Sequence, residues 1–251
     1  MLAAPDGAQR RRFMSRLAIL FTAAAAGALV DDGVAWRRLV ADHRTDIGKQ
    51  AEVVLDAQTR LLLNTRTAID VAAQDASREV RLLSGELLVR QGSGAAPLVV
   101  RTPQGRIQAR NARFAVRHLG EDTVLNVLQG SAEVLGADHA GGTLVPAGQG
   151  IRLSHAGAGT LHPVQDTDIA WINGQILAHD MKLADFIDEL QRYSPDLLQY
   201  DPQVANLPVS GRFPLNDVQG VFNWLSSTLP LRVDVVDHQW GRPLRHIRSV
   251  G

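Results

Sequence analysis

The side chains that most often carry catalysis are sparse and scattered in this chain of 251 residues. It contains no cysteine, which excludes a disulfide framework, a thiolate metal site and a cysteine nucleophile. None of its eight histidines lies within a predicted helix, so none can share a helical face with a second zinc ligand. The Gly-rich stretches, such as Gly148-Gln149-Gly150, fall between predicted strands, whereas a phosphate-binding loop must open a helix. We therefore predict that the protein is not an enzyme and has no cofactor or metal.

Aromatic side chains are the more informative group, because they are rare overall and gather near the C-terminus. They make up 5% of the chain, and Trp171, Tyr193, Phe213 and Trp224 all fall within one short region together with Phe186. Phe186 and Phe213 are expected in the core of that region. Trp171, Tyr193, Phe213 and Trp224 are our candidate partner-binding residues, since Trp and Tyr are favoured interface anchors. Addition of a partner strand to a free sheet edge is the alternative mode of binding.

The elements that hold these aromatics form a small α/β module over residues 168–236. Apolar residues at i, i+3, i+4 and i+7 predict a helix from Leu183, and the same spacing recurs 35 residues later from Val218. Asp180 is the expected N-cap of the first helix, and Asn216 or Asp217 that of the second. Strands are expected at 170–177, 209–213 and 231–235. Residues 237–251 carry three arginines and few apolar positions, which indicates a mobile basic tail.

Residues 44–162 instead show a period of two, which is typical of half-buried strands. The pattern Val80-x-Leu82-x-x-Gly85-x-Leu87-x-Val89 recurs 45 residues later as Leu125-x-Val127-x-x-Gly130-x-Ala132-x-Val134. Each copy is interpreted as strand, turn, strand. The fold class is therefore mostly β with a small α/β module, and the β-rich domain is predicted to be a β-sandwich or a β-solenoid-like roll.

The N-terminus has the features of an export or anchoring signal. Arg10-Arg11-Arg12-Phe13-Met14 resembles a twin-arginine export motif and precedes an apolar run of 14 residues, 17–30, which Asp31 and Asp32 end. We expect a cytoplasmic stub at 1–16, a transmembrane anchor or signal segment at 17–32, and residues 33–251 on the far side of the membrane. Cleavage after Ala26-Gly27-Ala28 is the alternative to an uncleaved anchor.

The overall charge argues against a nucleic-acid partner. The chain has 26 Lys and Arg against 26 Asp and Glu, whereas phosphate binding needs a basic surplus.

A series of motifs, taken in order, resembles the FecR family of iron-responsive signal transducers. The series includes Thr45-x-x-Gly48, Leu61-x-Leu63-Asn64, Arg78-x-Val80-x-Leu82-x-x-Gly85-Glu86, Phe114-x-Val116-Arg117, Val127-x-x-Gly130, Ala147-Gly148-Gln149, Ala170-Trp171-x-x-Gly174, Glu189-Leu190-x-Arg192-Tyr193 and Ser210-Gly211-x-Phe213. The resemblance implies a single-pass inner-membrane protein without catalysis. It implies two partners: the periplasmic signalling domain of a TonB-dependent outer-membrane receptor and, if an N-terminal domain exists upstream, an extracytoplasmic-function sigma factor. The C-terminal module is similar to the secretin and TonB short N-terminal fold and would receive the signal.

The chain departs from the family pattern at two places. Only Met1–Arg16 precede the apolar run, too little to bury the family's helical anti-sigma domain. Either the true start lies upstream, or this member is a signalling-deficient periplasmic binding or scaffold protein. The family often carries Gly-Thr before its Phe-x-Val strand, where some members cleave themselves through the Thr hydroxyl. Asn111-Ala112 stands there instead, and because alanine offers no nucleophile we predict no self-cleavage.

Overall fold

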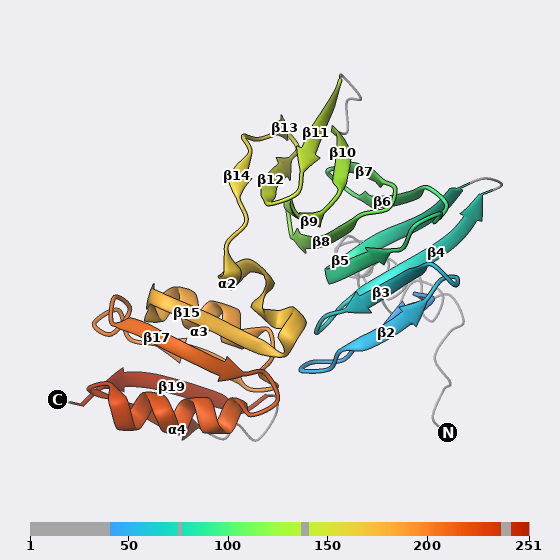
Figure 1. Cartoon of the computed structure of the whole chain (residues 1–251). Helices are drawn as coiled ribbons and strands as arrows, with labels where there is room; N and C mark the ends of the chain where they lie inside the picture. The colour runs from blue at the N-terminus through green and yellow to red at the C-terminus, as the bar shows by residue number, and fades with distance from the viewer. Residues whose placement is uncertain (1–40, 75–76, 137–140, 237–241, 251) are drawn as a thin grey trace, which may run out of the picture. The chain divides into compact units, whose positions relative to one another are not determined.

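The computed structural model describes residues 41–74, 77–136, 141–236 and 242–250. The stub predicted at 1–16, the apolar segment at 17–32 and the twin-arginine-like motif lie outside these residues. Within the described part of the chain, no helix has the length and apolar character needed to cross a membrane. The chain is mostly β, as predicted, with helices near its C-terminus (Figure 1).

The β-rich part, here called the β domain (residues 42–163), consists of two sheets that share one long strand, β5 (Ser77–Gln91). The first sheet has the order β1 (His43–Arg44), β4 (Ala68–Gln74), the first half of β5, β6 (Leu98–Thr102), β7 (Gly105–Ala109), β10 (Ser131–Gly136) and β11 (Gly142–Pro146). The second has the order β2 (Ala51–Val54), β3 (Thr59–Leu63), the second half of β5, β8 (Arg113–Leu119), β9 (Asp122–Gln129) and β12 (Gln149–Ser154). The short strands β13 (Gly157–Ala158) and β14 (His162–Pro163) both pair with β12. All pairs are antiparallel except β5 with β6.

One apolar core joins the two sheets. Its members alternate along the strands, as the period of two predicted, and come from both sheets, for example Val80 and Val100 from the first and Leu61, Phe114 and Leu125 from the second. All five are fully buried. Burial of each such side chain contributes roughly 1.5–3 kcal/mol, so this core is the main source of the domain's stability.

The predicted internal repeat is a real structural repeat, but it is not a pair of hairpins. In each copy the chain continues forward through the glycine and passes from one sheet to the other: β5 does so at Gly85, and β9 leads into β10 at Gly130. Both glycines have left-handed φ values, 89° and 75°. A Cβ on Gly85 would lie 2.4 Å from the Thr67 hydroxyl oxygen. The corner therefore requires glycine both because its φ is left-handed and because no room is left for a side chain. The sequence pattern of a glycine between two alternating segments is the same for a hairpin and for such a corner.

The C-terminal part, here called the α/β module (residues 166–249), contains a duplicated strand–helix–strand unit. The first copy is β15 (Gln175–Lys182), α3 (Leu183–Gln191) and β16 (Leu197–Tyr200), and the second is β17 (Pro208–Pro214), α4 (Val218–Thr228) and β18 (Leu231–Val236). The strands β15 and β17 pair with each other, and β16 and β18 flank β19 (Leu244–Ser249). The apolar stripes of both helices face one core, which contains Leu183, Phe186, Val221 and Phe222.

Two local predictions for this module were wrong. Residues 170–172 do not continue the strand: Asp166–Ile169 form α2 and Ala170–Asn173 a 3-10 turn, η1, because Gly174 takes a left-handed φ of 71° and closes the turn. Asp180 does not cap α3. It lies inside β15 with a positive φ of 51°, next to an irregularity in the pairing with β17, and Lys182 holds the N-cap position. The second helix is capped as predicted, because the Asp217 carboxylate accepts from the Gly220 backbone N–H.

The predicted mobile tail is also wrong for residues 244–249, which form the central strand β19. This strand pairs in parallel with β16 and in antiparallel with β18. Ile247 is fully buried, and the Arg245 guanidinium donates to the Asp196 carboxylate at 2.5 Å and lies over the Phe222 ring. The many arginines suggested a solvated tail, but each of these two residues gains its partner only through long-range pairing.

Candidate functional site

The second sheet of the β domain is covered on both faces, and its outer face carries the α/β module. Leu87 and Val89 belong to the core between the sheets, whereas Leu88 between them belongs to the core of the α/β module. Ala115 on the neighbouring strand β8 also faces the module. A strand buried on both faces is continuously apolar rather than alternating. The module is therefore packed against the β domain and buries apolar surface there.

Four charged side chains form a chain across this junction. Glu86, from the corner of β5, forms an ion pair with Arg192 at 2.6 Å, and Arg192, at the C-terminal end of α3, pairs with Glu189 at 2.5 Å. Arg117, from β8, pairs with the second oxygen of Glu189 at 2.9 Å. The exposed fraction of the side chain rises along the series, from 5% for Glu86 through 17% for Arg192 and 24% for Glu189 to 29% for Arg117. This charge chain therefore runs from the interior of the protein to its surface. It links the two parts of the molecule twice, once in the interior and once near the solvent.

Three neutral side chains, Asn64, Tyr193 and Gln50, complete the interior end of this network. The Asn64 side-chain amide donates to Glu86 Oε2 at 2.9 Å and to the Tyr193 hydroxyl at 2.8 Å, and Asn64 is fully buried. The Asn64 amide oxygen accepts from Gln50 Nε2, which also donates to the Trp171 backbone carbonyl at 3.0 Å. A buried polar network of this kind favours one docked geometry, since any other would leave its members without partners.

The ionisation of the network follows from burial and charge. Burial by itself would raise the pKa of Glu189, but the positive charges of Arg192 and Arg117 outweigh it and hold that pKa below its ordinary value. Burial opposes the charge on Arg192, yet Glu86 and Glu189 raise its pKa. Burial raises the pKa of the Tyr193 hydroxyl. At neutral pH Glu189 and Arg192 are therefore both ionised, and Tyr193 is neutral.

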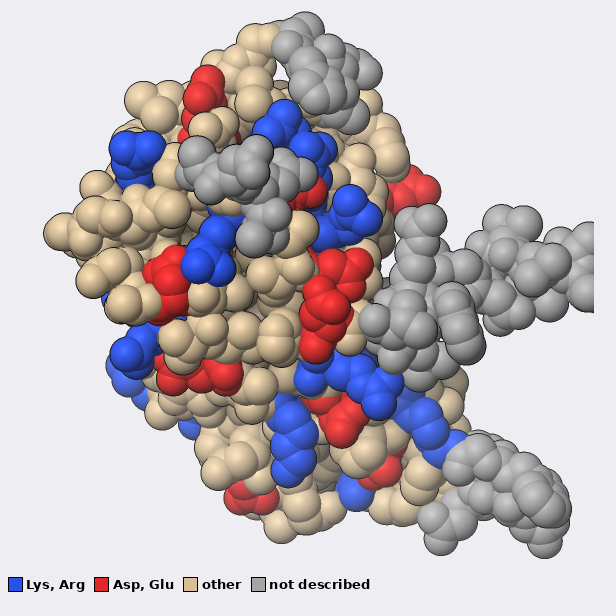
Figure 2. All heavy atoms as spheres, turned by 90° about the vertical axis from the view of Figure 1, so that its right-hand side faces the viewer, with Lys and Arg blue, Asp and Glu red and all other residues tan. Residues whose placement is uncertain are grey.

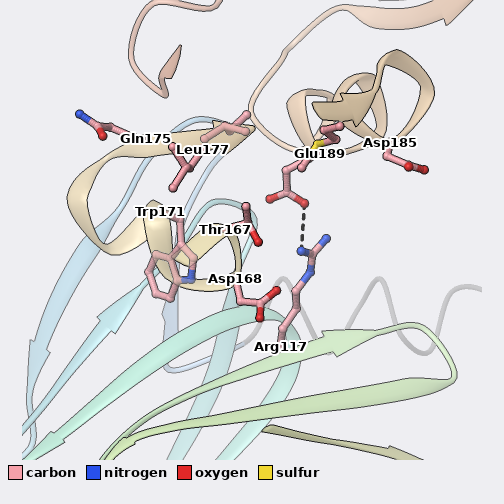
Figure 3. Close-up of a pocket in the computed structure, with 10 residues that line it drawn as sticks. Arg117, Thr167, Asp168, Trp171, Gln175, Leu177, Asp185 and Glu189 are labelled. Carbon is pink, nitrogen blue, oxygen red and sulfur yellow. Dashed lines mark ion pairs between the residues drawn. The ribbon is translucent and has the colours of Figure 1, made fainter. Parts of the chain in front are cut away.

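A pocket of about 170 Å³ opens beside the outer link of the chain (Figure 3). It lies between α2, β15, α3 and β8, and its lining includes Asp168, Trp171, Leu177, Asp185 and the Arg117–Glu189 pair. The Trp171 indole Nε1 is buried and has no hydrogen-bond partner among the residues that the structure describes. A buried donor left without an acceptor costs about 1–3 kcal/mol, so this atom is the one conspicuous unsatisfied group of the pocket.

The predicted partner-binding aromatics lie mostly inside the module. Trp171, Tyr193 and Phe213 are only 3–4% exposed, and Trp224 is partly buried. Phe213 packs edge-on against Phe186 and Trp224, at ring-centroid distances of 4.7 and 4.9 Å, which confirms the core position predicted for Phe186 and Phe213. The partner-binding role of the four stays a prediction. Because these side chains are largely buried, we expect a partner to contact the surface around Trp171 rather than an exposed aromatic patch.

Sequence reasoning missed the charge chain, although its residues stand in the motif series. Asn64, Glu86 and Arg117 belong to three separate motifs of the series, and Glu189 and Arg192 belong together to a fourth. The available signal was the charged Glu86 directly before the apolar run Leu87–Leu88–Val89, since a buried charge needs a partner. Which partner it finds depends on the docking of two elements more than 100 residues apart in the sequence.

The predicted self-cleavage position lies in a tight turn before β8. Asn111 is exposed with a positive φ of 52°, and Ala112 is buried against Gly130. The absence of self-cleavage stays a prediction.

The surface offers no large patch of one sign on the face drawn in Figure 2, where acidic and basic side chains are interspersed. Among the described residues, no group of three His, Asp or Glu side chains is arranged to hold a metal ion.

Comparisons with known proteins agree with the motif series. The family model described as FecR protein matches residues 41–133. Two solved structures of a candidate anti-sigma factor from Parabacteroides distasonis ATCC 8503 share the fold. The structure at 1.65 Å resolution has a TM-score of 0.65 and 18% identity, covering 83% of this chain and 99% of that one. The structure at 2.50 Å has a TM-score of 0.62 and 18% identity, covering 81% and 97%. No curated protein matches the chain. The resemblance predicted from the sequence is thus confirmed over residues 41–133, which match the FecR family model.

Proposed function

We propose that this protein is a sensor of cell-surface signalling that receives a signal outside the cytoplasm and regulates a sigma factor. The observation that carries the proposal is the docking of the α/β module on the FecR domain through the buried charge chain. The anti-sigma description of the structural neighbours supports it, because the shared fold covers both parts of the described chain.

The proposed partners follow from the family resemblance. The α/β module, with its duplicated strand–helix–strand unit, is proposed to have the secretin and TonB short N-terminal fold and to bind the signalling domain of a TonB-dependent outer-membrane receptor. An extracytoplasmic-function sigma factor is the proposed target of regulation. The proposed location is the inner membrane, with a single span and with residues 33–251 in the periplasm.

The junction gives a physical route for the signal. A partner that binds the α/β module acts on α3, which carries Glu189 and leads directly into Arg192. Separation of Arg192 from Glu86 would leave a buried carboxylate unpaired, which is strongly unfavourable, so the junction is either docked or open rather than gradually loosened. A ligand shifts such an equilibrium by its difference in affinity for the two states.

Calorimetry with the full-length chain in detergent tests the binding step. The titrant is the purified N-terminal signalling domain of the TonB-dependent receptor encoded nearest to this protein's gene. We expect saturable binding at micromolar concentrations, unchanged by Asp188→Asn, an exposed substitution on α3. If the signalling domain gives no heat of binding and does not co-elute with the full-length chain at high micromolar concentration, the receiver role is refuted and the scaffold alternative is favoured.

The location is tested separately. An alkaline phosphatase fusion after Gly251 should be active, because that enzyme folds only outside the cytoplasm, and the protein should sediment with inner membranes. N-terminal sequencing of the native protein then decides between an anchor and a cleaved segment, and an inactive fusion contradicts the proposed topology.

A further inference from the structure

We infer that the pocket between α2, β15, α3 and β8 receives a lysine or arginine side chain from an extended segment of a partner protein. The inference deepens the proposed function, and it rests on that function only in taking the partner to be the receptor's signalling domain.

The pocket is large enough for one side chain but not for a typical free small molecule. Its volume is about 170 Å³, whereas sites for free small molecules and cofactors usually measure about 300–1,000 Å³. Leu177 and Met181 form part of its wall and offer apolar contact to an aliphatic stem. A side chain with a long stem and a polar head fits this combination.

The charge of the pocket selects a cation. Three carboxylates, Asp168, Asp185 and Glu189, line it against one guanidinium, that of Arg117. Both oxygens of Glu189 are already occupied by arginines. Within the described part of the chain, Asp185 has no hydrogen bond or ion pair, and Asp168 accepts only the Gln165 backbone N–H, at 2.9 Å. Among the described residues, Asp168 and Asp185 therefore have no cationic partner.

The unpartnered Trp171 Nε1 argues that the cation belongs to a polypeptide. An indole N–H is a donor and repels a metal ion or a simple amine, so it needs an acceptor from the same ligand. The main-chain carbonyl that accompanies a basic side chain supplies one. Figure 3 shows Trp171 and Asp168 on one side of the pocket and Asp185 on α3 on the other.

Occupation of the pocket would act on the junction. The Arg117–Glu189 pair lines the pocket, so an incoming guanidinium competes with Arg117 for the Glu189 carboxylate. The inner pair, Glu86 with Arg192, does not line the pocket, so the incoming side chain acts on it only through Glu189. The site thus lies at the solvent end of the charge chain, where a partner can reach it.

Nuclear magnetic resonance of the full-length chain labelled with ¹⁵N-tryptophan tests the inference. The chain has four tryptophans, so four indole signals are expected, and Trp171→Phe identifies that of Trp171. The probe is N-acetyl-arginine amide, and the uncharged N-acetyl-norleucine amide is its control. We expect a saturable shift of the Trp171 signal at millimolar probe. Asp185→Asn should weaken the apparent affinity about fivefold, and the matched Asp188→Asn, outside the pocket, should leave it unchanged.

The results separate this inference from the proposed function. A Trp171 signal that does not move, or that moves equally with the uncharged probe, overturns the pocket. If the signalling domain binds in calorimetry but Asp185→Asn leaves its affinity unchanged, the pocket is again overturned while the proposed function stands. If the arginine probe binds as expected and the signalling domain does not, the pocket stands and the proposed function fails.

Discussion

Replacement of Arg192 by methionine should destabilise the folded protein by about 3–5 kcal/mol, because it leaves a buried charge without its counter-ion. The Glu86 side chain is 5% exposed and, of its partners in the described part of the chain, would keep only the Asn64 amide. Against a typical total of about 5–15 kcal/mol for unfolding, this is a large fraction. Arg117→Met removes the outer pair, whose members are 29% and 24% exposed, and leaves Glu189 with Arg192. That change should cost about 1 kcal/mol or less.

Urea unfolding of the full-length chain, followed by tryptophan fluorescence, measures both free energies. A double variant, Glu86→Leu with Arg192→Met, adds a sharper test, because exchange of a buried ion pair for apolar side chains is often nearly neutral. The double variant should therefore be more stable than Arg192→Met alone by about 2 kcal/mol. Equal costs for Arg192→Met and Arg117→Met, or a double variant no more stable than the single one, would refute the claim that burial sets the strength of this network.

Four further outcomes are expected. Gly85→Ala should destabilise by about 3 kcal/mol or more, and Gly94→Ala, which also has a positive φ but meets nothing within 4 Å, by about 1 kcal/mol, as measured by urea unfolding. Ile247→Ala should cost about 2–5 kcal/mol if β19 is a central strand, whereas a mobile tail would show no change in the same measurement. Because the folded-state pKa of Glu189 is lowered, its stabilisation is complete above the ordinary value of 4.5 and is lost as the pH falls through the lowered pKa; Glu189→Gln should flatten the loss of stability below pH 4.5, and an unchanged slope would contradict this. The Asn111–Ala112 bond should stay intact on storage, and a fragment that begins at Ala112 in the intact mass spectrum would disprove this.

The sequence by itself determined the features that depend on short-range spacing. Alternation along the chain identified the strands of the β domain, and the i, i+3, i+4, i+7 stripes identified α3 and α4, because each pattern reports one buried face of one element. The Asp217 cap was likewise predicted, since the carboxylate and the N–H that it accepts are three residues apart. The motif series identified the FecR domain without any knowledge of its contacts.

Only the tertiary structure decided the features that depend on partners distant in the sequence. The arginine-rich C-terminus becomes strand β19 because β16, almost 50 residues earlier, offers it a parallel edge. Glu86 can be buried because the α/β module brings Arg192 to it from 106 residues away. The corners at Gly85 and Gly130 were predicted to be hairpin turns, because the local sequence of a tight turn does not determine which strand pairs next. Long-range pairing depends on how the whole chain buries its apolar surface. The charge chain and its pocket therefore could be identified only from the packing of the α/β module on the β domain.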